Sequence, residues 1–153
     1  MRQHIDPRGP QFSAALTAVV LAAVLLTAPG AVATTLLFVQ AVLFAVGAGF
    51  GIMRTPYSWL YRRLVLPLVG PPAHREDPAP PRFAQALGLG FAVVGVVGFL
   101  AGATVLGLVA TGLALIAALL NAVFGFCLGC ELYLLAARAG LSSTISPTTR
   151  RTA

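Results

Sequence analysis

The sequence predicts an all-α membrane protein with four transmembrane helices, arranged as two parallel-repeat hairpins with a short interfacial helix in the central loop. Its composition, its apolar runs and an internal repeat carry this prediction. Of the 153 residues, 58% are hydrophobic and only 9% are charged, and the mean hydropathy is +0.91. A water-soluble domain needs more polar surface than this composition supplies.

Four apolar runs have lengths that suit membrane helices. They extend over 12–28, 31–53, 83–100 and 104–137. About 20 helical residues cross the roughly 30 Å hydrocarbon core of a bilayer, so each run can form one span, and the last can continue into the interface. The chain is therefore expected to be one membrane domain, with a first hairpin at 12–53, a loop at 54–82, a second hairpin at 83–138 and a disordered tail at 139–153.

An internal repeat opens the two hairpins. IDPRGPQFSAAL at 5–16 and EDPAPPRFAQAL at 76–87 align without a gap and share the pattern D-P-x-x-P-x-F. The hairpins also end alike, with Phe50-Gly51 in the first and Phe124-Gly125 in the second. We therefore expect two parallel copies of one hairpin, related by an axis along the membrane normal.

A cleavable leader is the alternative for the first helix. Arg2 and Arg8, the short apolar run and Ala31-Val32-Ala33 imitate a signal peptide and its cleavage site. The apolar sequence resumes directly after Ala33, however, and cleavage would destroy one copy of the repeat. The sequence therefore favours a retained first helix.

The arginines predict the orientation. All ten basic residues are arginines, the net charge is +6, and the arginines lie before the first helix, between the second and third, or after the fourth. By the positive-inside rule this side is cytoplasmic, so we expect a multi-pass protein of the bacterial plasma membrane with both termini in the cytoplasm. Because the arginines lie between apolar runs, they suit anionic lipid headgroups and not nucleic acid.

The central loop combines an amphipathic stretch with a linker. Helical spacing of aromatic and apolar residues, with flanking tryptophan and arginine, predicts a helix in the headgroup region, and a partner-docking surface is the alternative. The residues are Tyr57, Trp59, Leu60, Tyr61, Arg62, Arg63, Leu64 and Leu68. The proline-rich stretch at 70–81 is expected to be an extended linker.

Cys127 and Cys130 are the two cysteines of the chain and form one C-x-x-C pair. Positions three apart share one face of a helix, so the sulfurs can meet or can bind one soft metal together. We expect the pair near the cytoplasmic end of the fourth helix, where thiols stay reduced and a disulfide is transient and catalytic. The alternative is that two small apolar side chains pack at a helix crossing.

Glu131 and Arg54 are the ionisable residues expected to act on this pair. Glu131 directly follows the second cysteine and could accept a thiol proton, or it only solvates the helix end. The repeat register places Met53 opposite Cys127 and so Arg54 at a similar depth, where a cation would favour the thiolate. Alternatively, Arg54 is an ordinary topology anchor.

The remaining polar and small residues suggest structure more than chemistry. Amides within spans, here Gln40 and Asn121, more often join helices than contact substrate. G-x-x-x-G at 47–51, 98–102 and 125–129 predicts close helix contacts in a bundle or a homodimer. No metal site or cofactor is predicted, because nothing fixes His4 or His74 near the cysteines.

The ending FGFCLGCELYLL and the two repeat openings resemble a family of small bacterial four-helix integral membrane proteins with a C-terminal GFCxGC-type cysteine pair, known only as a domain of unknown function. The likeness covers nearly the whole chain except the two tails. Members of that family look like companions of thioredoxin-like and rhodanese-like sulfurtransferase proteins. The resemblance thus implies thiol or sulfur chemistry by association.

Three hypotheses follow. In the first, the chain is a thiol–disulfide or sulfur-relay component that exchanges with a soluble thioredoxin-like or sulfurtransferase partner, tuned by Glu131 and Arg54. In the second, it is a non-enzymatic scaffold or small transporter subunit with structural cysteines. The third is a similarity to four-helix quinone-linked thiol oxidoreductases, which also carry C-x-x-C in a membrane helix. Against the third stand the single cysteine pair and its predicted cytoplasmic side.

Overall fold

The structure is a computed structural model that describes residues 5–74 and 76–140. Arg2, His4, Arg75, Arg150, Arg151 and the predicted tail beyond residue 140 therefore lie outside the described residues. Within the described part, every element is helical except one isolated β-bridge. The four long helices are α1 (Arg8–Thr27), α2 (Ala31–Phe50), α5 (Ala79–Leu100) and α6 (Thr104–Phe124).

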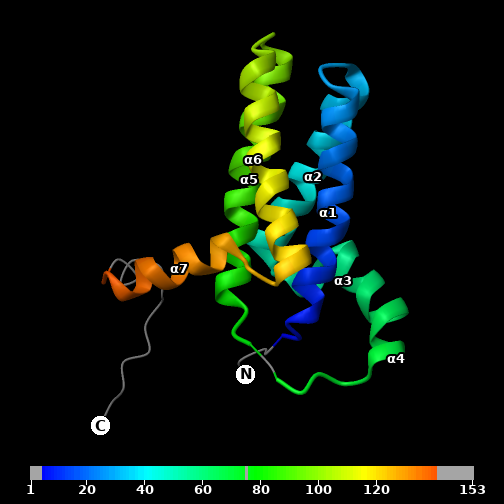
Figure 1. Cartoon of the computed structure of the whole chain (residues 1–153), viewed down its shortest axis with the longest axis vertical. Coiled ribbons are helices and arrows are strands. Elements are labelled where there is room, and N and C mark those ends of the chain that lie inside the picture. Colours follow the sequence, from blue (N-terminus) through cyan, green and yellow to red (C-terminus); the bar gives the residue numbers. More distant parts are fainter. Residues whose placement is uncertain (1–4, 75, 141–153) are drawn as a thin grey trace.

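All four long helices are long and apolar enough to cross a membrane. They stand side by side as an upright bundle (Figure 1). This confirms the prediction of an all-helical chain with four candidate spans and indicates a multi-pass membrane protein.

The first turns of α1 and α5 begin earlier than predicted. The Oδ1 atom of Asp6 accepts the N–H of Arg8 at 3.0 Å, and the Oδ1 atom of Asp77 accepts the N–H of Ala79 at 2.9 Å. Prolines in and before these turns are compatible with a helix, because first-turn N–H groups have no partner inside the helix. Hydropathy misses both turns because they are polar and proline-rich.

The predicted continuous helix over 104–137 is wrong. Helix α6 ends at Phe124 because Gly125 adopts the left-handed conformation, with φ of +65°. A separate helix, α7 (Leu128–Arg138), projects sideways from the foot of the bundle (Figure 1). Helix α2 likewise ends before the predicted Met53, at Phe50, where Gly51 has φ of +94°.

A helical segment occupies the first part of the central loop. It consists of a 3₁₀ turn, η1 (Ile52–Arg54), then α3 (Pro56–Leu60), a π-helical turn η2 (Tyr61–Val65) and α4 (Leu66–Val69). Pro67 has no N–H to donate to a preceding carbonyl, which accounts for the irregular turn before it. The residues with the predicted helical spacing, from Tyr57 to Leu68, therefore lie in three consecutive short elements, α3, η2 and α4.

The four long helices form a closed ring of contacts. Helix α1 packs on α2 and α6, and α5 packs on the same two helices, so α1 and α5 lie across a diagonal. The buried cluster includes Leu21, Val24, Leu37, Phe44 and Phe99. Much of it lies toward the hairpin turns, and α1 contributes two fully buried side chains to it.

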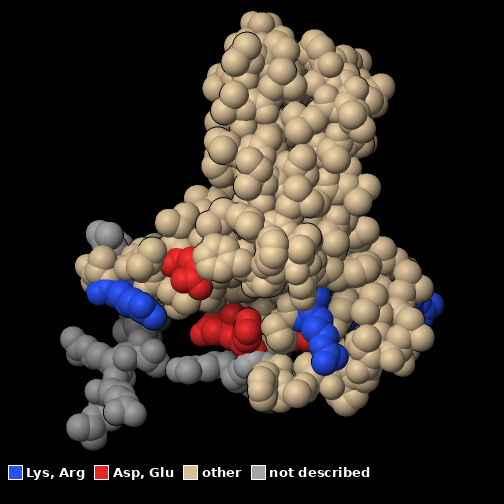
Figure 2. All heavy atoms as spheres, in the orientation of Figure 1, with Lys and Arg blue, Asp and Glu red and all other residues tan. Residues whose placement is uncertain are grey.

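Charged side chains gather at the opposite end. Figure 2 shows them around the foot of the bundle, whereas the upper part of this face carries none. Among the described residues, they precede α1 or α5, lie in the first turn of these helices, or follow α2 or α6: Asp6, Arg8, Arg54, Arg62, Arg63, Glu76, Asp77, Arg82, Glu131 and Arg138. The bundle therefore has one uncharged end and one charged end.

The two halves of the chain make matching contacts at the charged end. Ile5 and Glu76, which occupy the same position in the two sequence copies, form an antiparallel bridge with N···O distances of 3.0 and 2.9 Å. The Gln11 amide of α1 donates to the carbonyl of Ala122 at the end of α6, at 3.0 Å. Its counterpart Arg82, on α5, donates to the carbonyl of Ala48 at the end of α2, also at 3.0 Å.

Candidate functional site

The cysteine pair lies where α6 gives way to α7. The N–H of Gly125 bonds to the carbonyl of Asn121 at 3.0 Å, and the N–H of Phe126 bonds to that of Leu120 at 3.3 Å, which closes the end of α6. After this reversal Cys127 is extended and becomes the N-cap of α7. The glycine thus turns the chain so that one cysteine precedes the new helix and the other lies in its first turn.

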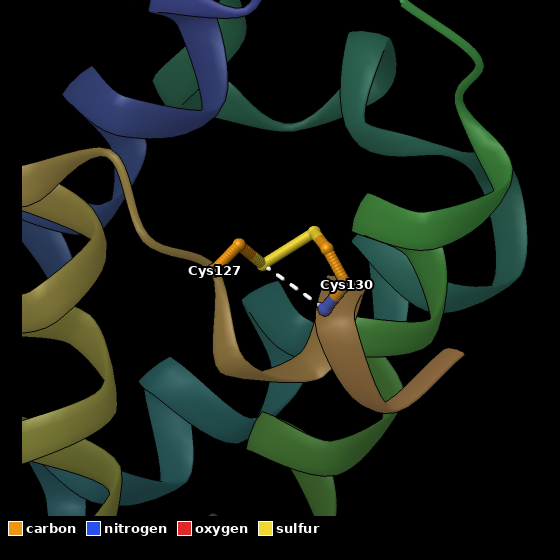
Figure 3. The surroundings of a disulfide bond; sticks show 2 residues. All are labelled: Cys127 and Cys130. Carbon is orange, nitrogen blue, oxygen red and sulfur yellow. Dashed lines mark hydrogen bonds between the residues drawn. A yellow bond between two sulfur atoms is a disulfide. The ribbon is translucent and has the colours of Figure 1, made fainter. Parts of the chain in front are cut away.

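Cys127 and Cys130 are joined by a disulfide (Figure 3). Their Cα atoms are 5.1 Å apart, within the usual range for a disulfide. The Sγ atom of Cys127 also accepts the N–H of Cys130, at 3.3 Å. The prediction that the sulfurs can meet is therefore confirmed, although the two residues are a helix cap and a first-turn residue and do not share the face of one long helix.

The start of α7 provides an environment that suits a thiolate. A helix N-terminus carries unpaired N–H groups and a partial positive charge. Reduction of the disulfide would leave the Cys127 sulfur beside the N–H of Cys130, where a negative charge is stabilised. Both cysteines are partly exposed.

Close contacts with α5 fix the position of α7. A Cβ atom added at Gly129 would come within 2.6 Å of the Cα atom of Ala84, so only glycine permits this approach without movement of the backbone. Further along α7, the ring of Tyr133 lies 5.8 Å from that of Phe83. The disulfide is therefore held against the first turns of α5.

Each predicted G-x-x-x-G motif divides into one packing glycine and one turn glycine. Gly47, Gly98 and Gly129 lie against Gln85, Gly107 and Ala84, respectively. The other three glycines have positive φ: Gly51, Gly102 and Gly125. The motifs therefore join helices within the chain, and half of their glycines end helices.

The structure brings Glu131 to the cysteines but not Arg54. Glu131 lies in the first turn of α7, and its N–H bonds to the carbonyl of Cys127 at 3.0 Å. Arg54 ends η1, after the first hairpin, and its side chain is exposed. In this segment the residue with the role of Cys127 is Thr55, which caps α3 by accepting the N–H of Ser58 at 3.3 Å. By its capping role, the counterpart of Cys127 is therefore Thr55, two residues after the Met53 that the repeat register predicted.

The two intramembrane amides differ in their surroundings. Gln40 is buried, donates to Thr17 of α1 at 3.4 Å and accepts the hydroxyl of Tyr57 at 2.9 Å, so it joins helices as predicted. Burial raises the pKa of the Tyr57 phenol, which keeps this donor protonated. Asn121, in contrast, lines a cavity.

This cavity, about 350 Å³ in volume, lies between the helices beside the disulfide. Its walls come from parts of α1, α5, α6 and α7, with Phe44 of α2 and Ile52 of η1, and Cys127 is part of them. Most of the lining is apolar, including Phe91, Ala117 and Leu132. The sequence pattern gave no sign of this space, because it depends on how six separate segments pack.

His74 is exposed, and its Nδ1 atom lies 2.8 Å from the carbonyl of Ala73. Among the described residues, no group of three or more His, Cys, Asp or Glu side chains could hold a metal ion. The site is thus built around the sulfur pair.

These features define a class: a four-helix membrane protein with a helix-capping cysteine pair at its charged end. The chain belongs to the family described as Domain of unknown function (DUF4395), whose model matches residues 5–138. The matched region includes the four long helices and α7. No curated protein and no solved structure matches the chain.

Proposed function

We propose that the chain is a membrane thiol–disulfide exchange protein in which Cys127 and Cys130 alternate between a disulfide and two thiols. The observation that carries the proposal is the cap geometry, in which the Cys127 sulfur accepts an N–H bond at the start of α7 and is bonded to Cys130. Partial exposure of both cysteines at the charged end supports access by a soluble thioredoxin-like partner. A sulfur pair needed only for packing does not require this cap.

The exchange proceeds by two displacements. A partner thiolate attacks the Sγ atom of Cys130, a partner–Cys130 disulfide forms, and the Cys127–Cys130 bond breaks with Cys127 leaving as a thiolate. The second partner thiolate attacks the partner's own bonded sulfur and releases Cys130. Two electrons and two protons pass from the partner to this chain. Cys127 is assigned as the leaving group because its thiolate is stabilised by the helix N-terminus.

Glu131 and Arg54 are proposed to modulate these steps. Glu131 lies one residue from Cys130 and is exposed, so it can pass a proton from water to the Cys130 thiolate when the partner releases it, and can accept that proton again when the pair is reoxidised. Arg54 is exposed at the same end of the bundle and contributes positive potential there, without contacting the pair. Glu131→Gln should therefore slow exchange more than Arg54→Gln.

Purified protein mixed with reduced thioredoxin tests the exchange directly. The redox state of the cysteines is read by a gel shift with a bulky maleimide. The wild-type disulfide should be reduced while thioredoxin is oxidised. A reduced thioredoxin variant that lacks its second cysteine should be trapped on the wild-type protein as a mixed disulfide through Cys130, and much less through Cys127, as read by peptide mass spectrometry. A wild-type pair that stays oxidised in excess reduced thioredoxin would leave the cysteines structural, as in a scaffold.

We further propose that the charged end is cytoplasmic. Support comes from the arginines, of which all the described ones lie at this end. In oriented vesicles reduced beforehand, a membrane-impermeant maleimide should label the pair from the cytoplasmic face alone. Labelling from the outer face alone would reverse the orientation.

The segment from η1 to α4 is proposed to lie in the headgroup region. Trp59 is 57% exposed and Leu68 is 86% exposed, beside the exposed Arg62 and Arg63, and the Arg63 guanidinium lies 5.8 Å from the Trp59 ring. Tryptophan and arginine are typical of this depth. Fluorescence of Trp59, the one tryptophan, should be quenched strongly by brominated lipids with shallow labels and weakly by those with deep labels.

The two halves are proposed to be copies of one hairpin. Support comes from the Ile5–Glu76 bridge between equivalent positions and from the pairing of each copy's first helix with the other copy's second helix. The matched carbonyl contacts of Gln11 and Arg82 add to it. Such contacts are expected for a two-fold axis that passes between the copies.

A further inference from the structure

The cavity beside Cys127 has an unusual lining for the interior of a membrane bundle. Two amide side chains, Gln85 of α5 and Asn121 of α6, contribute to its otherwise largely apolar wall. The structure gives neither side-chain amide a hydrogen-bond partner among the described residues. An amide inside a bundle normally bonds to a neighbouring helix, as Gln40 does here. Both amides therefore have unused hydrogen-bonding groups for a ligand, and the Gln85 side chain is held in place by its contact with Gly47 of α2.

The cavity opens on the flank of the bundle. Three of its lining side chains, Leu113, Ile116 and Leu132, are also about half exposed, at 49%, 56% and 51%. They belong to α6 and α7, and in a bilayer their exposed surfaces face lipid. A molecule dissolved in the membrane can thus enter sideways, without passing through water.

We propose that this cavity binds a lipid-soluble quinone, which reoxidises the reduced Cys127–Cys130 pair. A quinone has an apolar ring, which suits the wall, and two carbonyl oxygens, which can accept N–H bonds from Gln85 and Asn121. A lipid acyl chain would leave both amides unpaired. The volume of about 350 Å³ lies within the range of small-molecule sites, and an isoprenoid tail can leave through the lateral opening.

The redox step balances with the groups at hand. The two thiols lose two protons and two electrons, two S–H bonds break, and the S–S bond between Cys127 and Cys130 forms. The quinone takes up the two electrons and two protons, forms two O–H bonds and leaves as a hydroquinone. Cys127 is the residue of the pair that lines the cavity, so its thiolate is the one that meets the quinone.

One cysteine pair is sufficient for this cycle. The proposal rests on the thiol exchange proposed above, and the same pair first oxidises a soluble partner and is then oxidised by the quinone. Both reactions take place at the foot of the bundle, so no second pair is needed to carry electrons across the membrane. The single cysteine pair and its predicted cytoplasmic side therefore do not argue against quinone-linked chemistry when the whole cycle takes place on one side of the membrane.

The test uses the full chain, purified, reduced, freed of reductant and kept anaerobic. Ubiquinone-1 is added, and the thiols are counted by maleimide gel shift while hydroquinone is measured by absorbance. The expected result is one hydroquinone per disulfide formed. Diamide, a water-soluble thiol oxidant, is used in parallel, so that each variant yields a ratio of quinone-driven to diamide-driven oxidation.

Two cavity variants and one matched control locate the reaction. Gln85→Leu/Asn121→Leu removes both amides, and Ala117→Phe fills the cavity. The control Ala86→Phe adds the same ring on α5 at an exposed residue that does not line the cavity. Loss of two hydrogen bonds should lower the ratio about tenfold. Ala117→Phe should lower it at least as much, and Ala86→Phe should leave it unchanged.

The outcomes separate the two proposals. A pair that exchanges with thioredoxin but is not oxidised by ubiquinone-1 overturns the quinone proposal alone. A ratio that is unchanged in both cavity variants also overturns it, since the quinone would then react without the cavity. Failure of the wild type to exchange with thioredoxin counts against the function itself. Elution volume and circular dichroism show whether each variant is folded. If Ala117→Phe does not fold, the result of the Gln85→Leu/Asn121→Leu variant decides the test.

Discussion

The turns that follow α2 and α6 both end in a residue whose side chain caps the next helix, and they differ in the atoms that they bring together. After α2, the Oγ1 atom of Thr55 accepts the N–H of Ser58 at 3.3 Å, and the two hydroxyls are 3.2 Å apart. After α6, the Sγ atom of Cys127 accepts the N–H of Cys130 at the same distance, and the sulfurs are bonded. A cap needs only an acceptor. Oxygen and sulfur both supply one, but only sulfur adds redox chemistry.

The residues before and after the two turns are also alike. Each turn follows a Phe-Gly pair whose glycine has positive φ. Each is followed by a tyrosine whose ring lies 5.8 Å from a phenylalanine near the start of the first helix in the same half, in the pairs Phe12–Tyr61 and Phe83–Tyr133. Cys127 lines the large cavity, whereas Thr55 does not. The cavity draws its walls from both halves of the molecule, but of the two capping residues only Cys127 lines it.

Replacing sulfur by oxygen in the second turn should have the largest effect. Cys127→Ser/Cys130→Ser keeps an acceptor at the cap, so the protein should fold, but all exchange with thioredoxin should be lost. The converse change, Thr55→Cys/Ser58→Cys in this background, should form a disulfide, because both caps make the same hydrogen bond at 3.3 Å and the Thr55 and Ser58 side chains already lie in contact. That disulfide should not be made by ubiquinone-1, since neither Thr55 nor Ser58 lines the cavity. Maleimide gel shifts measure each state.

Crowding the contact beneath α7 should have the next largest effect. Gly129→Ala places a methyl group against the backbone of Ala84, so it should destabilise the protein by about 1–3 kcal/mol, the usual cost of overpacking. Gly90→Ala is the control, because a Cβ atom there meets nothing within 4 Å. Thermal unfolding in detergent compares them. Equal melting temperatures would show that α7 is not held at this contact.

Tyr61→Phe should destabilise the protein more than Tyr133→Phe, as measured by thermal unfolding in detergent. The hydroxyl of Tyr61 donates to the Oδ2 atom of Asp6 at 2.7 Å, so its loss should cost about 1.5 kcal/mol, as for a bond to a charged acceptor. Tyr133→Phe, which leaves the ring contact with Phe83 in place, should cost less.

Burial, followed by the hydrogen bond and charge of Asp6, raises the pKa of Tyr61 to about 12. The folded pKa thus exceeds the unfolded value of about 10. The associated stability is complete below about pH 10 and is lost as the pH rises through about 12. Wild type should lose stability over this interval more steeply than Tyr61→Phe, measured by chemical unfolding. Parallel pH profiles would show that this phenol does not titrate as described.

The smallest effect concerns the caps themselves. Thr55→Ala should cost about 1 kcal/mol, the usual value for loss of an N-cap. Cys127→Ala, compared with reduced wild type, should cost less at pH 6, because a neutral thiol is a weak acceptor. Its cost should increase with pH as the thiolate forms. A cost for Cys127→Ala that does not depend on pH would argue against a capping thiolate.

The sequence predicted the parts of this molecule that depend on local composition. Apolar runs predicted the four candidate spans, and the length of the fourth helix placed the cysteines at the same end as the arginines. The break after Phe124 was missed because apolar residues continue through it, and because Gly125 could equally have been a packing glycine in a G-x-x-x-G motif. The unpaired amides of Gln85 and Asn121 could not be recognised, since their shared cavity exists only after segments from both halves of the chain have packed.

The equilibrium reduction potential of the Cys127–Cys130 disulfide, measured on the full chain in lipid with thiol redox buffers, tests the central claim most directly. Structural disulfides resist reduction and have potentials below about −300 mV. A disulfide that exchanges with a partner should lie above that value, and Cys127 should be the cysteine that a limiting amount of iodoacetamide alkylates first after reduction. A potential below about −300 mV, with both cysteines inert to iodoacetamide, would contradict a redox role for the pair.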